Sequence, residues 1–259
     1  MTFYSIPVGL CDAFPGRPLI LRTADSNEPR RLLGPLAPAG VAYLQVTTLA
    51  QDLAPLSDWG AGLAIDLLMA DPATEFPLLY RCTGLLACHP VRVTIPLLPG
   101  LARAVKLALS LDFAVRLVGH QPGATAVAEA RQALAGYLHS PTVAQPAEPF
   151  HSLLLGFVHD SPVCLWSVLE QDPDATCWLD DQGEAATDRA PESLTAWRDT
   201  LITRGAECGD CPWFPTCSGY FQWPHIGHDC TGVRLLFADL QSAAAELRAD
   251  LAASAAVQD

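Results

Sequence analysis

The sequence predicts an α/β protein, a partial (β/α) barrel or a short parallel sheet with helices, followed by a cysteine-rich segment. From about residue 40 to 140, short apolar runs alternate with longer segments of helical spacing. After a stretch rich in proline at 141–150 the pattern changes, and four of the nine cysteines then lie within 208–230. We therefore expect a βα-repeat domain over residues 1–150 and a metal-binding region over residues 151–259.

The first half of the chain contains four strand-like runs. They are VAYLQV at 41–46, LAIDLLM at 63–69, VRVTIPL at 91–97 and FAVRLVG at 113–119. Between them the apolar residues recur at helical spacing, as at Leu101, Val105 and Leu109. Strand, helix and strand in repetition imply a parallel sheet with right-handed crossovers. Four or five such units are too few for a complete eightfold barrel, which favours a partial barrel or a smaller open sheet.

The second half begins with two strand-like runs, at 163–171 and 175–188, and Gly183 supplies a tight turn in the second. A helix is predicted next, with Pro191 in its first turn and Gly205 at its end. Residues 232–251 carry an apolar stripe at helical spacing. The cysteines at 208–230 are therefore expected in a loop between two helices.

Composition and charge restrict the partners that this protein is expected to bind and the cellular compartment in which it is expected. The chain has 15 basic and 28 acidic residues, a net charge of −13 and a single lysine, Lys106, so a clustered basic face for nucleic acid is not expected. The N-terminus does not resemble a secretory signal, and no apolar run approaches the roughly 18 residues that cross a bilayer. We expect a soluble cytoplasmic protein, in which close cysteines more often hold a metal than form disulfides.

The four clustered cysteines follow the spacing C-x2-C-x5-C-x12-C. A gap of two residues lets both sulfurs of the first pair reach one metal from a single turn, and the later cysteines close the site from a returning loop. No Lys or Arg lies between Arg204 and Arg234, so a metal would have to offset the charge of clustered thiolates. We predict that one metal centre is held by Cys208, Cys211, Cys217 and Cys230.

Spacing alone permits two kinds of metal. Zinc accepts four cysteines, or three together with His225 or His228. A four-iron cluster benefits from an apolar shield and from N–H donors. The shield is available in Trp213, Phe214, Tyr220, Phe221 and Trp223, although these aromatics also suit a small core that replaces regular structure in a loop.

The run CGDCPWFPTCSGYF, followed by Cys230 and a helix, resembles the C-terminal SPASM-type extension of radical SAM peptide and protein maturases. In that family the matching four cysteines ligate an outer auxiliary [4Fe–4S] cluster. The resemblance implies the same role for Cys208, Cys211, Cys217 and Cys230, in a SPASM-like extension on a partial barrel. Its specific part covers about residues 183–230.

Two departures from the family limit the chemistry that the resemblance implies. The positions of two inner-cluster cysteines hold Phe221 and Asp188, so an inner cluster is not expected. The C-x3-C-x2-C loop that binds the SAM-cleaving cluster is absent, and Cys11 stands alone. We expect a protein that cannot cleave SAM and that serves as an accessory, electron-transfer or peptide-binding partner in peptide or protein modification. The alternative is a structural or interaction protein that holds zinc.

Polar residues within the strand-like runs form a second candidate functional site. If they point into the barrel they form a polar pocket for a peptide or carboxylate ligand, and if they point outward they meet the helices. These residues are Asp66, Arg92, Thr94 and Arg116.

The remaining cysteines are interpreted as packing residues. Cys82, Cys88 and His89 together would make a weak second metal site, and Cys164 and Cys177 lie in apolar runs. No hydrolase, zinc-protease or phosphate-binding motif occurs in the sequence.

Overall fold

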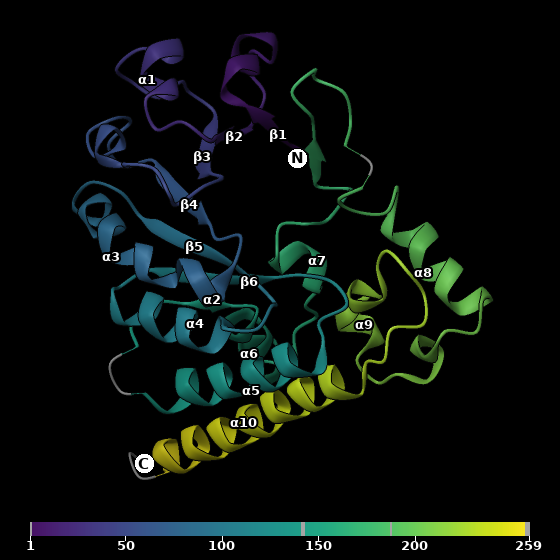
Figure 1. Ribbon diagram of the computed structural model, residues 1–259. Coiled ribbons are helices and arrows are strands. Elements are labelled where there is room, and N and C mark those ends of the chain that lie inside the picture. Colours follow the sequence, from purple (N-terminus) through teal and green to yellow (C-terminus); the bar gives the residue numbers. More distant parts are fainter. Residues whose placement is uncertain (1, 141–142, 187, 257–259) are drawn as a thin grey trace.

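The computed structural model describes residues 2–140, 143–186 and 188–256. Eight parallel strands form one half-barrel sheet in the order β7-β6-β5-β4-β3-β2-β1-β8 (Figure 1). The strands are β1 (Phe3–Pro7), β2 (Leu19–Thr23), β3 (Val41–Val46), β4 (Ala64–Leu68), β5 (Val91–Pro96), β6 (Ala114–Val118), β7 (Ala147–Glu148) and β8 (Thr176–Trp178).

The helices vary from single turns to a long C-terminal helix. They are α1 (Glu28–Leu33), α2 (Pro72–Glu75), α3 (Leu79–Cys82), α4 (Leu101–Ser110), α5 (Ala124–His139), α6 (Phe150–Val158), α7 (Leu165–Val168), α8 (Leu194–Thr203), α9 (Phe214–Cys217) and α10 (Thr231–Ala256). Short 3₁₀ turns include η5 (Glu207–Asp210) and η6 (Tyr220–Gln222). Figure 1 shows α3, α4 and α5 on one side of the sheet and α7 with the cysteine-bearing segment on the other.

The two faces of the sheet differ in polarity. In register, Arg22 pairs with Gln45, Gln45 with Asp66, and Asp66 with Arg92, so these side chains share one face, here called the polar face. The residues between them in sequence point to the helix-covered face and are buried and apolar, including Leu21, Leu44, Ile65, Leu67, Val93, Val115 and Leu117. Burial of this apolar face against the helices contributes roughly 25 cal/mol per Å², so it holds the sheet and leaves the polar face for other roles.

The connection between β5 and α4 is fixed by a residue of α5. The Gly100 N–H lies 3.0 and 2.8 Å from the two carboxylate oxygens of Glu129, and the Ala102 N–H donates to the same carboxylate at 3.1 Å. These N–H groups have no partner within α4 because they belong to its first turn. Gly100 has a φ of +98°, and a Cβ there would lie 2.6 Å from the Ala73 Cα atom. Glycine and Glu129 together therefore set where α4 begins.

The four strands predicted in the first half are confirmed, as β3 to β6. Two strands, β1 and β2, precede them and were not predicted. The strand predicted at 163–171 is wrong, because that run contains α7, a single helical turn in which Leu165 and Trp166 are buried. A short continuous apolar run fits a buried strand and a buried helical turn equally well, so periodicity could not separate them.

Much of the second half also attaches to the sheet. β8 pairs with β1, and beyond it Leu179 bridges Ala185 around Gly183, which has a φ of +84°, as the predicted turn requires. The division at residue 150 stays a prediction. Residues 141–142 of the expected linker lie outside the described residues, while its end forms β7 and the start of α6.

The two helices predicted around the cysteines are confirmed. α8 ends at Thr203, and Gly205 follows with a φ of +65°. Pro191 lies before α8 rather than in its first turn, since Ser193 is the N-cap and accepts from the Ala196 N–H. α10 packs along α5 and α6, which anchors it to the half-barrel (Figure 1). Within the described part of the chain, no helix has the length and apolar character needed to span a membrane.

Candidate functional site

The four cysteines of the C-x2-C-x5-C-x12-C motif line one pocket, here called the cysteine pocket. They come from η5, the turn after it, α9 and the residue before α10. The volume of the pocket is about 20 Å³, which is room for roughly one water-sized group. Its walls are formed by Glu207, Cys208, Cys211, Trp213, Phe214, Cys217, Phe221, Gln222, Cys230, Val233, Arg234 and Phe237. The convergence of the four thiols on one place agrees with the motif.

Backbone N–H groups surround the sulfur of Cys217. Ser218 and Gly219 both have left-handed φ values, +48° and +74°, and they turn the chain back over α9. The backbone N–H groups of Gly219, Tyr220 and Phe221 hydrogen-bond to Cys217 as a result. Successive N–H groups that converge in this way form a concave site for an electron-rich atom. Burial raises the pKa of the Cys217 thiol to about 12, although the N–H donors act in the opposite direction and lower it.

Side-chain donors reach two of the other sulfurs. Gln222 Nε2 lies 3.3 Å from Cys230 Sγ, and the guanidinium of Arg234 hydrogen-bonds to Cys211. Arg234 also pairs with Glu207 at 2.9 Å. Its Nε atom is buried beside the pocket and has no hydrogen-bond partner among the residues that the structure describes. The sequence-based view that no basic residue offsets the thiolates is corrected here, because Arg234 in the first turn of α10 folds back onto the pocket.

The thiols are close enough to influence one another. Burial, together with a smaller contribution from the nearby Cys211, raises the pKa of Cys208 to about 11. Burial likewise raises the pKa of Cys230 to about 12, with Cys217 among the contributing charges. All nine cysteines are free. As neutral thiols they are compatible with burial, whereas a bound metal would replace their protons.

The described conformation does not itself form a metal-ligand set. Across residues 2–140, 143–186 and 188–256, no group of three or more His, Cys, Asp or Glu side chains is arranged to hold a metal ion. The assignment of the four cysteines as ligands stays a prediction. His228 is half-buried, with no partner for Nε2 in the described part of the chain, and His225 is exposed.

The aromatic residues expected to shield this site divide into two groups. Trp213, Phe214 and Phe221 line the cysteine pocket, and the ring of Trp213 stacks on Phe237 at 5.5 Å between centroids. Tyr220 instead packs on Trp166 on the polar side of the sheet, at 4.9 Å between ring centroids. Trp223 packs on Trp197 of α8. These last two rings attach the cysteine segment to the rest of the chain.

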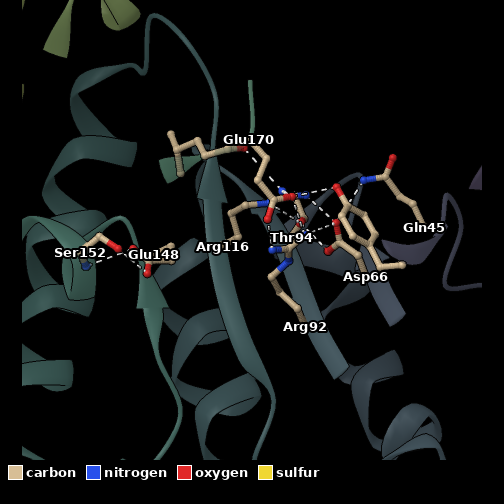
Figure 2. Close-up of polar contacts among 10 residues, drawn as sticks. Gln45, Asp66, Arg92, Thr94, Arg116, Glu148, Ser152 and Glu170 are labelled. Carbon is tan, nitrogen blue, oxygen red and sulfur yellow. Dashed lines mark hydrogen bonds and ion pairs between the residues drawn. The ribbon is translucent and has the colours of Figure 1, made fainter. Parts of the chain in front are cut away.

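A second polar cluster occupies the polar face, and Figure 2 shows its members pointing toward one another. Asp66 is its centre and is 1% exposed. Its carboxylate accepts from Thr94 Oγ1 at 2.6 Å, Arg92 Nη2 at 3.2 Å, Arg116 Nη2 at 2.5 Å and Gln45 Nε2 at 3.1 Å. The four strand residues singled out from the sequence are therefore brought together. Burial would raise the pKa of Asp66, but the two guanidinium groups outweigh it and hold that pKa below its usual value.

Glu170 completes this cluster and was not predicted. It lies two residues beyond the end of α7 in a left-handed conformation, with a φ of +57°. Its carboxylate accepts from Arg92 Nη1 at 2.7 Å, Arg92 Nη2 at 3.0 Å, Arg116 Nη1 at 2.5 Å and Tyr43 Oη at 2.8 Å. Burial opposes ionisation, but the hydrogen bond from Arg92 and the charge of Arg116 lower the pKa of Glu170. We call Tyr43, Gln45, Asp66, Arg92, Thr94, Arg116 and Glu170 the polar network.

A cleft of about 950 Å³ opens beside the polar network at the amino-terminal ends of β4, β5 and β6. Tyr43, Asp66, Arg92 and Glu170 of the network line it, and of the two carboxylates that of Glu170 is the more exposed. Apolar side chains, including those of Leu86 and Val168, form part of its wall. The network therefore combines buried charges with access for a small ligand.

The segment around α7 joins the polar network to the cysteine segment. Trp166 Nε1 donates to the carbonyl of Ser218 at 3.2 Å. The hydroxyl of Tyr220 donates to Gln171 Oε1 at 2.6 Å and accepts from the Gly119 N–H at 3.1 Å. Gln171 follows Glu170 directly, so one short segment contacts both clusters.

The other cysteines do not form a second site. Cys82 is buried, with its Sγ atom 3.5 Å from the carbonyl of Leu78. Both ring nitrogens of His89 lie 2.9 Å from backbone carbonyl oxygens, those of Leu63 and Leu56. A histidine engaged on both sides is not free to bind a metal. Cys82 is buried as a packing residue should be, whereas Cys88 is exposed, so its interpretation as a packing residue is wrong.

Comparison with known proteins gives no assignment. No protein-family model, no curated protein and no solved structure matches this chain. The functional interpretation consequently depends on the residues of the two clusters.

Proposed function

We propose that this chain is an iron–sulfur protein that resembles radical SAM/SPASM maturases and holds one [4Fe–4S] cluster. The proposed ligands are Cys208, Cys211, Cys217 and Cys230. The observation that carries the proposal is the set of donors around their sulfurs, which comprises three consecutive backbone N–H groups on Cys217, Gln222 on Cys230 and Arg234 on Cys211. Donors of this kind stabilise sulfur atoms that carry negative charge.

The proposed role is that of an accessory protein in peptide or protein modification. A bound cluster would supply one-electron transfer, while the chain itself would position a peptide or a maturation enzyme. We propose that the protein does not cleave SAM, because the three-cysteine loop that leaves an iron open for SAM is absent from the sequence. A cytoplasmic location follows from the same proposal, since free clustered thiols suit a reducing compartment. Neither nucleic acid nor a membrane is a proposed partner.

Zinc binding in a structural or interaction protein is the second candidate. The observation that favours it is the size of the cysteine pocket, about 20 Å³, which suits a single ion better than a cluster. Four thiolates at tetrahedral geometry satisfy zinc without any change in redox state.

Anaerobic reconstitution of the full chain separates the two candidates. The purified apoprotein is offered iron and sulfide in one sample and zinc in another, followed by metal and acid-labile sulfide analysis. We expect iron and sulfide in equal amounts with a brown colour. Cys217→Ser should abolish this uptake, while Cys164→Ser, a matched control outside the pocket, should retain it. Colourless protein with one zinc per chain and no bound sulfide would replace the iron–sulfur proposal with the zinc alternative.

The same preparation tests SAM chemistry. The reconstituted protein is incubated with SAM and dithionite, and 5′-deoxyadenosine is measured. We expect no more product than in a control without protein. Formation above that control would refute the proposal that the chain cannot cleave SAM.

A further inference from the structure

The charges of the polar network divide into a fixed part and a part added from outside the sheet. Asp66, Arg92 and Arg116 project from neighbouring strands and together leave one positive charge in excess. Glu170 comes from the segment after α7 and neutralises that charge. Without Glu170, the sheet would present two guanidinium groups and one carboxylate to the cleft.

The contacts of Glu170 are those of a bound carboxylate. Arg92 forms two parallel N–H bonds to its two oxygens, at 2.7 and 3.0 Å, and Arg116 and the Tyr43 hydroxyl complete the set. Paired donation by arginine matches the planar geometry of a carboxylate, and such charged hydrogen bonds are among the stronger ones in proteins. The residues that supply these donors lie on β3, β5 and β6, so the sheet positions their backbone independently of the segment that carries Glu170.

Glu170 is also the member of the network best placed to leave. Its side chain is 35% exposed, against 1% for Asp66 and 5% for Arg116. It has a left-handed φ of +57°, a strained conformation for a non-glycine residue. The cleft of about 950 Å³ reaches it directly. A ligand that entered this cleft would meet Glu170 before it met the buried carboxylate of Asp66.

We propose that Arg92, Arg116 and Tyr43 form a carboxylate-binding site, and that Glu170 is a built-in occupant that the ligand displaces. The ligand class is a small molecule or peptide that carries a free carboxylate, with the C-terminal carboxylate of a peptide as the favoured source. A carboxylate that replaces Glu170 keeps the charge of the network unchanged and takes over its four hydrogen bonds. The apolar wall of the cleft then contacts the rest of the ligand. This site deepens the peptide-binding part of the proposed function, but it requires no metal in the cysteine pocket.

Titration calorimetry on the full-length protein tests the site with N-acetylalanine, which carries one carboxylate, and with its neutral amide. Glu170→Ala empties the site and should bind N-acetylalanine about tenfold or more tightly than the wild type does, equivalent to about 1.4 kcal/mol. The amide should bind neither protein. Glu148→Gln changes another acidic residue of the same cleft, one that contacts Ser152 rather than the network (Figure 2), and should alter affinity less than twofold.

Further variants locate the bound carboxylate. Tyr43→Phe in the Glu170→Ala background removes one donor without removing charge and should weaken binding severalfold. If Glu170→Ala does not fold, as judged by circular dichroism, Glu170→Gln keeps the shape of the side chain and should still bind more tightly than the wild type. N-acetylaspartic acid 1-amide, whose carboxylate is on the side chain, distinguishes an acidic side chain from a chain terminus as the source.

Three results would overturn the proposal. The first is equal affinity for N-acetylalanine and its amide. The second is no gain of affinity when the charge of Glu170 is removed. The third is an equal gain of affinity in Glu148→Gln, which would mean that losing any acidic residue of the cleft reduces its repulsion of the ligand. The titrations are run on apoprotein and on metal-reconstituted protein. Failure of reconstitution therefore leaves the carboxylate result intact, and failure of carboxylate binding leaves the metal result intact.

Discussion

The polar network and the cysteine pocket are both buried clusters of ionisable groups, but they are neutralised in different ways. In the network, Arg92 and Arg116 face Asp66 and Glu170, so the chain supplies both signs of charge. In the pocket, four thiols share the donors of one guanidinium and a few N–H groups, and burial raises the pKa values of three of them, Cys208, Cys217 and Cys230. Both signs of charge are therefore balanced within the network, whereas the pocket contains one guanidinium, that of Arg234, and a metal there stays a prediction.

The largest expected effect is on the cysteine pocket. If a metal completes it, reconstitution should raise the free energy of unfolding by several kcal/mol, toward the order of 10 kcal/mol known for structural zinc. Urea unfolding with and without a chelator measures this change. Hydrogen exchange should show the loss of protection on chelation at about 206–231 and the first turn of α10, because α5 and α6 hold the remainder of α10. Equal unfolding free energies with and without metal would mean that the cysteine pocket, like the polar network, needs no added group to be stable.

A smaller effect is expected from the network. Asp66→Asn should lower the free energy of unfolding by about 3–5 kcal/mol, since it removes the more deeply buried of the two carboxylates that pair with the buried guanidinium of Arg116. Asp112→Asn is the matched control. Asp112 borders the same cleft but is exposed, and its φ of +62° suits asparagine, so a change within about 0.5 kcal/mol is expected. Similar losses of unfolding free energy in both variants would mean that the buried ion pairs of Asp66 do not stabilise the fold.

The turn that aims N–H groups at Cys217 allows a third test. A Cβ at Gly219 would lie 2.1 Å from Leu201 Cδ1 and 2.8 Å from Trp197 Nε1, at a φ of +74°. Gly205 has a similar φ of +65° but open space around it. Gly205→Ala should therefore cost about 1–2 kcal/mol for the left-handed backbone, and Gly219→Ala should cost about 1–3 kcal/mol more and reduce metal uptake. Equal thermal shifts and equal metal content in the two variants would argue that the conformation at Gly219 does not matter for the site around Cys217.

The smallest effect concerns pH. The folded protein lowers the pKa values of Asp66 and Glu170, so both carboxylates stabilise the fold above their unfolded pKa values of about 4. That contribution is lost as pH falls below this range and through the lower folded values. Glu170→Gln removes one of the two groups and should flatten the decrease in stability on the acid side. Urea midpoints between neutral and acidic pH measure the slopes, and superimposable profiles for the two proteins would show that Glu170 is not coupled to folding.

The sequence predicted the regular parts of both clusters and not the parts contributed by irregular segments. The strand-like runs placed Asp66, Arg92 and Arg116 on β4 to β6, and the period of a strand determines which of their side chains share a face. Which way that face points was left open by the sequence. Glu170 was missed, since it follows a helical turn too short to leave a periodic signal. Arg234 was missed because its contact with the cysteines depends on how α10 leaves the loop.

The cysteine pocket shows the same limit. Spacing predicted that the four thiols would meet, and they line one pocket. The N–H groups that face Cys217 depend on two successive left-handed residues. Of these, Gly219 carried a sequence signal and Ser218 did not. The identity of any bound metal depends on pocket dimensions that residue types do not encode.

The carboxylate of Glu129 also constrains the order in which the chain is assembled. It satisfies N–H groups that lie 27 and 29 residues earlier, at the start of α4. During synthesis, α4 is complete before Glu129 exists, and until α5 docks only water can occupy those donors. We therefore expect α4 and α5 to become stable together rather than one after the other. A chain that ended between them would have an α4 whose first-turn N–H groups lack their carboxylate partner.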